Sequence, residues 1–345
     1  MSLFFIVAGF FARLLHQRLG TGGLLKNRLR RIGLPLLVFY VLVTPLTIVA
    51  FIWGARQLGI QGPPRMAPPF PIVGPPVPWR HLWFLYLLLV LYTLVMPLRA
   101  LFARLDGSGA VRNAIGRALA SSVRTRVAPL LLAAPIATLL FVTPWWHQWM
   151  GIPAPILGLV PNVPGLLAFG GAFLVGWFIH REQDCLRALA ADWPLYLAGA
   201  LLTTAAALYI VGITPTFEPM ALTDIERMAY AGAYTLALWC WSFASIGMAV
   251  RFLDAPSARW RYLADASYWM YLIHLPIVSL LQAWMLGWPL HWSIKFALIL
   301  VITAALLFGT YHYLVRFTFM GRFLNGRKHA RPGAPANATR STSPG

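Results

Sequence analysis

The chain opens with SLFFIVAGFFARLL at residues 2–15 and continues with HQRLGTGGLLKNRLRRIGLP at residues 16–35. The first stretch is an apolar run of the kind that enters a bilayer, and the second is strongly basic. Lys and Arg of short connections stay on the cytoplasmic side, so the first span runs from outside to inside, with Met1 at the outer face. We therefore expect one more helix before Ser2.

Composition predicts a polytopic membrane protein. The 345 residues are 59% hydrophobic and only 11% charged, with a mean hydropathy of +0.69. No soluble domain of this size covers so much apolar side chain. We predict an all-α transmembrane helix bundle with about nine spans, at roughly 2–15, 33–53, 82–102, 127–143, 165–180, 194–214, 230–250, 267–287 and 293–315.

The connections between these segments alternate in character. Most of the Lys and Arg fall in residues 16–32, 99–126, 181–193, 251–266 and the tail from Arg316, whereas residues 54–81, 144–164, 214–229 and 288–292 are rich in Pro and Trp. This pattern predicts a multi-pass protein of a bacterial inner membrane with a cytoplasmic C-terminus. It also explains the net charge of +19 as a topology signal and attraction to anionic lipid rather than a nucleic-acid footprint.

Two connections are long enough for a role of their own. Residues 99–126 are typical of a basic amphipathic helix on the inner membrane face, or of a plain topology anchor. Residues 214–229 hold Glu218, Asp224 and Glu226, either a carboxylate pair for acid–base work or simply solvated acids. We expect no disulfide and no metal site, because Cys185 and Cys240 lack metal-ligand spacing and lie in a predicted cytoplasmic loop and within a span, respectively.

Arg28 and Arg31 are the first candidate site residues. Spaced three apart, they share one helix face and present planar donor forks suited to phosphate or carboxylate. The alternative is plain positive-inside anchoring. His81, with Trp83 two residues on, is the second candidate, because a histidine among interfacial tryptophans suits a sugar or a base role. It also suits a capped interfacial residue.

The third candidate is SYWMYLIHLP at residues 267–276. Ser267, Tyr271 and His274 recur at helical spacing and share one face, with His274 about two turns from the cytoplasmic side. Pro276 loosens the local helix ladder. The alternative for a lone membrane histidine is a structural hydrogen bond. We find no glycine-rich phosphate loop, zinc pattern or nucleophile elbow.

Three segments taken together resemble one family. LFFIVAGFFARLL with LLKNRLRRIGLPLLVF, then HLWFLYLLLVLY, then SYWMYLIHLPIV are similar to the integral-membrane acyltransferase 3 family, and most similar to its glucan biosynthesis protein C branch, which succinylates periplasmic glucans. The resemblance runs from residue 3 to about residue 315. It implies an acyltransferase-like bundle over residues 1–315, with residues 316–345 as a basic, disordered cytoplasmic tail.

The resemblance also implies a reaction. Ten helices would pass an acyl group, succinyl or acetyl, from a cytoplasmic acyl-CoA to an extracytoplasmic carbohydrate such as a periplasmic glucan. Acyl-CoA would be a co-substrate, with no permanently bound cofactor, and the machinery of glucan synthesis would be a partner. By motif, Arg28 and Arg31 would bind the donor's phosphates. His81 with Trp83, and Tyr271 with His274, would line the site.

One element of the family pattern has no counterpart here. The family places its catalytic histidine on a first helix, which would precede Ser2, and His16 does not replace it because it lies at the cytoplasmic end of the following span. His274, Tyr271 and His81 are therefore the candidate catalytic residues of this chain. Two alternatives to an active enzyme remain: a catalytically inactive relative, and a transporter or flippase, which helix-interrupting Pro45 and Pro135 would suit.

Overall fold

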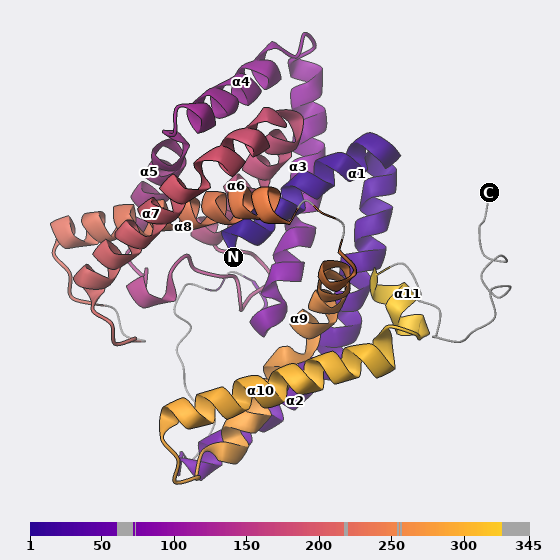
Figure 1. Cartoon of the computed structure of the whole chain (residues 1–345), viewed down its shortest axis with the longest axis vertical. Helices are drawn as coiled ribbons and strands as arrows, with labels where there is room; N and C mark the ends of the chain where they lie inside the picture. Colours follow the sequence, from indigo (N-terminus) through magenta and orange to yellow (C-terminus); the bar gives the residue numbers. More distant parts are fainter. Residues whose placement is uncertain (61–71, 73, 217–219, 254, 256, 326–345) are drawn as a thin grey trace, which may run out of the picture. The chain divides into compact units, whose positions relative to one another are not determined.

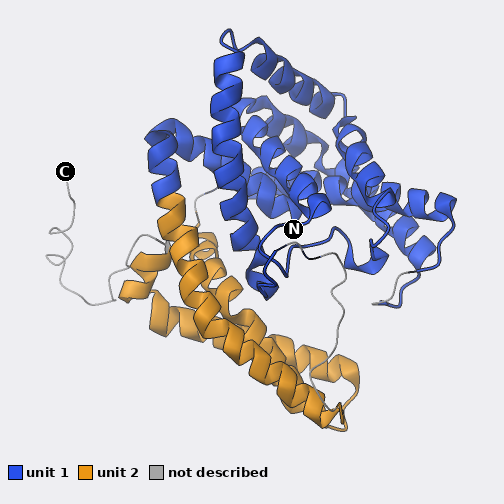
Figure 2. Ribbon diagram, turned by 180° about the vertical axis from the view of Figure 1, so that it is seen from behind, with its two compact units in different colours: residues 1–26, 67–256 blue, residues 27–66, 257–345 orange. Residues whose placement is uncertain are grey.

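The computed structural model describes residues 1–60, 72, 74–216, 220–253, 255 and 257–325. All regular elements in these residues are helices, which confirms the predicted all-α bundle (Figure 1). The chain forms two compact units, one from Met1–Lys26 with Ala67–Pro256 and the other from Asn27–Met66 with Ser257–Gly345 (Figure 2). We call these unit 1 and unit 2 and describe each by itself.

Unit 1 contains most of the apolar helices. Its elements, with α1 continuing two residues past the unit's edge, are α1 (Ser2–Arg28), η2 (Arg80–Leu82), α3 (Trp83–Leu105), α4 (Ala110–Arg124), α5 (Ala128–Phe141), η3 (Gln148–Met150), α6 (Val163–Arg181), α7 (Asp184–Val211) and α8 (Asp224–Phe252).

Helices α1 and α6 touch backbone to backbone through two glycines. A Cβ on Gly9 would lie 1.9 Å from the carbonyl oxygen of Phe173, and a Cβ on Gly176 would lie 1.8 Å from that of Ile6. Neither position has room for a methyl group. Small residues allow this approach in membrane helices, where packing rather than hydrophobic burial holds helices together.

Helices α7 and α8 form an antiparallel pair with the same device. A Cβ on Gly247 would lie 2.2 Å from the carbonyl oxygen of Leu189. The turn between α4 and α5 is tied to α7, because Arg126 in that turn donates two hydrogen bonds of 3.1 and 2.9 Å to the carboxylate of Asp192 in α7. Helices α4 and α5 meet at an angle of 110° across that turn.

Unit 2 is a smaller helical assembly. Its elements are η1 (Leu29–Gly33), α2 (Leu34–Gln57), α9 (Ala258–Met285), α10 (Trp292–Thr310), η4 (Tyr311–Val315) and α11 (Phe319–Asn325). Helix α9 packs along α2, with the rings of Phe39 and Trp269 edge to face at 5.8 Å. It also contacts α10, where the Trp269 indole N–H donates 3.0 Å to the hydroxyl of Thr310.

The number of spans differs from the sequence-based count of nine. By length and hydropathy, six helices of the described residues can cross a membrane, or seven if α4 and α5 form one broken span. The first two predicted spans lie in one helical run, Ser2–Gln57, so the expected connection at 16–32 is helical, apart from a break at Gly20 (φ 67°). Helix α9 falls outside the count because its tyrosines, tryptophans and histidine lower its hydropathy.

The connections are more ordered than the sequence indicates. Residues 99–105 continue α3, and the helix expected in 99–126 is α4, which begins only at Ala110. Asp224 and Glu226 lie in the first turn of α8, where Thr223 and Glu226 form a reciprocal capping box, while Glu218 is outside the described residues. In the predicted tail, Phe319–Asn325 is helical, and residues 326–345 are outside the described residues.

Candidate functional site

Arg28 and Arg31 lie where the helix widens. Leu29–Gly33 forms a π-turn, because the N–H of Leu34 bonds to the carbonyl of Leu29 five residues earlier. Such single π-turns inside a helix occur frequently at functional sites. Arg31 is exposed and Arg28 half-buried. The sequence predicts these two arginines on one helix face, and the wider turn alters the spacing of their side chains around the axis.

The π-turn is tied to the helix that carries the third motif. The hydroxyl of Tyr268 on α9 donates a 2.8 Å hydrogen bond to the backbone carbonyl of Arg31. The structure therefore brings the arginine motif and the YLIH motif together within unit 2. Sequence reasoning missed Tyr268, although its place three residues before Tyr271 puts it on the same side of the helix.

His274 has a defined orientation. Its Nδ1 lies 2.8 Å from the carbonyl oxygen of Tyr271. A carbonyl only accepts, so Nδ1 carries the proton, and in the neutral ring Nε2 is then the acceptor. Pro276, two residues on, has no N–H to offer the helix, which loosens the ladder beside the imidazole. The carbonyl of Tyr271 thus holds one edge of the imidazole in place.

Ser267 is not part of this arrangement. It is exposed, and its hydroxyl donates 2.8 Å to the carbonyl of Ala264 in its own helix. Tyr271 is half-buried, with its ring centroid 6.1 Å from that of His274.

His81 and Trp83 belong to unit 1. His81 lies in the short helix η2, half-buried, after Arg80, whose φ of 50° marks a sharp entry to α3. Trp83 is 8% exposed and packs among aromatic rings, 5.2 Å from Phe169 and 6.1 Å from Phe5. In the structure Trp83 thus supports the packing of α1, α3 and α6.

The Pro/Trp connections of unit 1 are held to each other. The ring of Trp79 stacks on Tyr86 at 4.4 Å, and its indole N–H donates 2.8 Å to the carbonyl of Gly158. The hydroxyl of Tyr86 donates to the carbonyl of Leu159. Residues 75–80 and 154–160 therefore form one ordered surface at the predicted outer side.

Unit 1 also contains a cavity of about 440 Å³. Its walls come from α7, α8, the start of α1 and the loop at Gln148, and they include Trp149, Tyr230, Tyr234 and Trp241. Two of these hold the loop: Tyr230 donates 2.8 Å to the carbonyl of Gln148, and Tyr234 accepts 3.0 Å from the N–H of Ile152. The sequence offered no signal for this cavity, because its residues meet only through the fold.

The described part of the chain offers no metal centre. No group of three or more His, Cys, Asp or Glu side chains gathers there. Cys185 and Cys240 are both buried and free.

The fold and these features define a multi-pass membrane protein of helices, with an arginine-bearing π-turn held against a histidine helix. The chain belongs to the acyltransferase 3 family, since residues 1–312 match the family described as "Acyltransferase domain". Searches among curated proteins and solved structures found no match.

Proposed function

We propose that this protein is a membrane-bound O-acyltransferase that moves a succinyl or acetyl group from a cytoplasmic acyl-CoA to an extracytoplasmic carbohydrate, such as a periplasmic glucan. Membership of the family supports the reaction class. The observation that carries the proposal for this chain is the hydrogen bond from Tyr268 to the carbonyl of Arg31. It joins a cation motif suited to a phosphorylated donor to a helix that carries an oriented imidazole.

In this proposal Arg28 and Arg31 bind phosphates of the donor. Each guanidinium can donate two parallel hydrogen bonds to a pair of phosphate oxygens. A donor whose phosphates are held in this way by both arginines has its thioester in a fixed place. His274 acts as the base. Nε2 takes the proton of an acceptor hydroxyl, whose oxygen attacks the thioester carbonyl carbon. The C–S bond then breaks, and the thiolate leaves with the proton returned by the imidazolium.

The remaining predicted residues line the site. Tyr271 lines it beside His274, and its phenol is a donor for the charge that develops on the thioester oxygen. His81 and Trp83 belong to the acceptor side, where the ordered Pro/Trp connections offer aromatic faces for sugar rings. The machinery of glucan synthesis would be the partner, and the membrane a bacterial inner membrane with the C-terminus inside.

Arg28→Ala and Arg31→Ala in the full-length gene test the proposal. Mass spectrometry of cell-envelope glycans, with and without the gene, should show an acyl modification that both variants abolish. Arg30→Ala is the matched control, because Arg30 has the same charge in the same turn and should leave the modification in place. Normal modification in both variants at normal protein levels would overturn the proposal.

A further inference from the structure

Four arginines from four different helices gather in unit 1. They are Arg13 of α1, Arg99 of α3, Arg112 of α4 and Arg181 of α6, and we call them the basic cluster. Each lies in or beside a connection that the charge pattern predicts on the cytoplasmic side. The cluster shares no residue with the arginine motif at Arg28 and Arg31, which belongs to unit 2.

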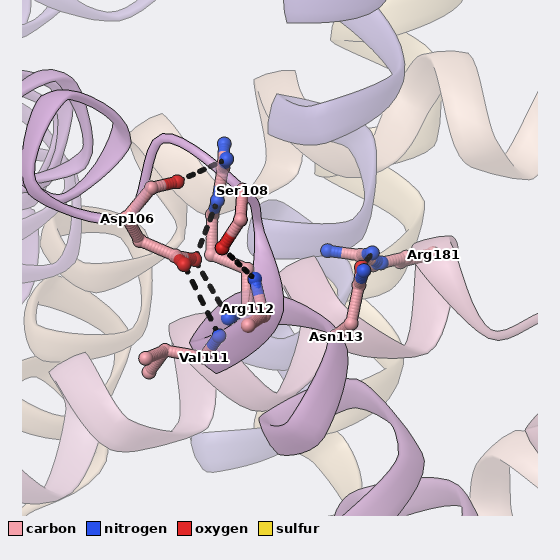
Figure 3. Close-up of polar contacts among 7 residues, drawn as sticks. Asp106, Ser108, Val111, Arg112, Asn113 and Arg181 are labelled. Carbon is pink, nitrogen blue, oxygen red and sulfur yellow. Dashed lines mark hydrogen bonds and ion pairs between the residues drawn. The ribbon is translucent and has the colours of Figure 1, made fainter.

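Contacts between these helices hold the cluster in place. Arg181 donates to the side-chain oxygen of Asn113, which joins α6 to α4 (Figure 3). The guanidinium of Arg13 lies 5.6 Å from the centroid of the Trp177 ring, which joins α1 to α6. Arg181 and Arg99 are close enough to Arg13 to repel its positive charge, and Arg112 is close enough to repel that of Arg99.

Two carboxylates form ion pairs with arginines of the basic cluster. Asp106 forms an ion pair of 3.1 Å with Arg112, and Glu182 one of 3.5 Å with Arg181. The Asp106 carboxylate also accepts hydrogen bonds from the backbone N–H groups of Val111 and Arg112, so both of its oxygens are bonded at the start of α4 (Figure 3). The described residues thus leave two positive charges of the cluster uncompensated.

Polar atoms at the cluster are also buried without a partner in the described residues. His180, on α6 next to Arg181, is only 8% exposed, and its Nδ1 has no hydrogen-bond partner. Its ring lies edge-on to Phe10 at 4.7 Å, and the charge of Arg13 acts on it. The Nε of Arg13 is likewise buried and unpartnered. Such groups are costly unless a ligand satisfies them.

We propose that the basic cluster binds a phosphate group. A phosphate monoester carries about two negative charges near pH 7, which matches the two uncompensated positive charges. Its three oxygens accept from several directions at once, as guanidiniums arriving from separate helices require. A carboxylate is planar and carries one negative charge, so it would neutralise only one of the two uncompensated positive charges.

Two sources of phosphate reach this face of a membrane protein. One is the phosphorylated part of coenzyme A, and that source rests on the proposed function. The other is the headgroup of an anionic lipid that is itself a phosphate monoester, namely phosphatidic acid. The experiment has one arm for each source and uses binding rather than turnover, so it can fail while the acyl-transfer proposal survives.

The test uses the full-length protein in nanodiscs of neutral lipid. Calorimetric titration with coenzyme A forms one arm, and native mass spectrometry with added phosphatidic acid forms the other. Arg13→Gln and Arg181→Gln should weaken at least one probe tenfold or more. Arg117→Gln on the exposed face of α4 is the matched control and should change neither probe by more than about twofold.

Each outcome decides. Loss in the coenzyme A arm identifies the donor as the source, and loss in the lipid arm identifies the headgroup. Wild-type affinity for both probes in both variants, no binding of either probe to the wild type, or equal loss in Arg117→Gln overturns the proposal. Arg13→Lys keeps the charge with one donor group in place of the fork. Where Arg13→Gln fails to fold, the folded Arg13→Lys variant should bind the probe more weakly than the wild type, and wild-type affinity in it would overturn the proposal.

Discussion

The hydroxyl of Tyr268 donates a 2.8 Å hydrogen bond to the backbone carbonyl of Arg31, across the interface of α9 with the π-turn. This contact links two motifs more than two hundred residues apart in the sequence. It fixes the position of the backbone from which the Arg31 side chain extends.

Tyr268→Phe removes this hydrogen bond and nothing else. Because the bond positions the donor-binding turn, we expect KM for acyl-CoA to rise about two- to tenfold, the loss of one hydrogen bond, with kcat little changed. Steady-state assays of the full-length enzyme measure both constants. Tyr313→Phe is the control, since that ring is 76% exposed in the same unit. A fall in kcat alone would contradict a positioning role.

His274→Gln removes the base and keeps a polar side chain of similar reach. If Nε2 takes the acceptor's proton, kcat should fall by about a factor of 100 to 10,000 while coenzyme A binding persists. Single-turnover transfer measurements together with binding titrations separate the two effects. His312→Gln, in the same unit, should leave kcat within a factor of two. Transfer at the wild-type rate in His274→Gln would exclude the imidazole as base.

Gly176→Ala tests the close approach of α1 and α6. The added methyl would lie 1.8 Å from the backbone oxygen of Ile6, which cannot move aside as a side chain could. We expect a loss of stability of about 1–3 kcal/mol or more, seen as a lower apparent Tm in detergent. Gly171→Ala on the same helix has open space at its Cβ and should leave Tm unchanged or raise it. Equal behaviour of the two variants would refute the contact.

Asp106 predicts a pH dependence in α4. Hydrogen bonds from the backbone N–H groups of Arg112 and Val111 and from the Arg112 side chain hold the pKa of this carboxyl below its ordinary value. Because the pKa is lower in the folded state, the ionised carboxyl stabilises the folded state at pH values above the unfolded-state pKa of about 4. This stabilisation disappears as the pH falls through the folded-state pKa. The protection of the α4 amides, taken as the exchange rate relative to the intrinsic rate at each pH, should therefore fall as the pH drops below about 4.

The control for this pH dependence is internal. In Asp106→Asn the α4 amides should exchange faster than in the wild type at neutral pH, and the difference should vanish at low pH. Asp184→Asn, which removes an exposed ion pair with Arg187, should have no such effect on α4. Protection of the α4 amides, corrected for the intrinsic exchange rate, that does not change with pH in the wild type would show that the carboxylate does not hold the helix start.

The sequence predicted the apolar helices well because their signal is local. The segments at 127–143, 165–180 and 230–250 match α5, α6 and α8 closely, since a long apolar run in a bilayer must satisfy its own backbone as a helix. The sequence did not predict that residues 16–32 stay helical, because glycines and arginines there are typical of a connection. Only Gly20 breaks the run.

The candidate site divides in the same way. The sequence alone identified the motif residues, because each motif depends on spacing within one helix; these residues are Arg28, Arg31, Tyr271 and His274. It also predicted the alternation of basic connections. It did not predict the contact of Tyr268 with Arg31 or the gathering of Arg13, Arg99 and Arg181, because these join residues from separate helices. The family resemblance assigned Trp83 to the lining of the site, and the structure adds its place in an aromatic cluster with Phe5 and Phe169.

The sequence by itself determined that this protein is an all-α membrane protein of the acyltransferase 3 family, because hydropathy, basic connections and short motifs are properties of neighbouring residues. Only the tertiary structure decided which motifs meet, which glycines admit a neighbouring backbone and where uncompensated charge collects. These depend on which helix faces which, and side chains far apart in the chain set that by how closely they let the helices pack.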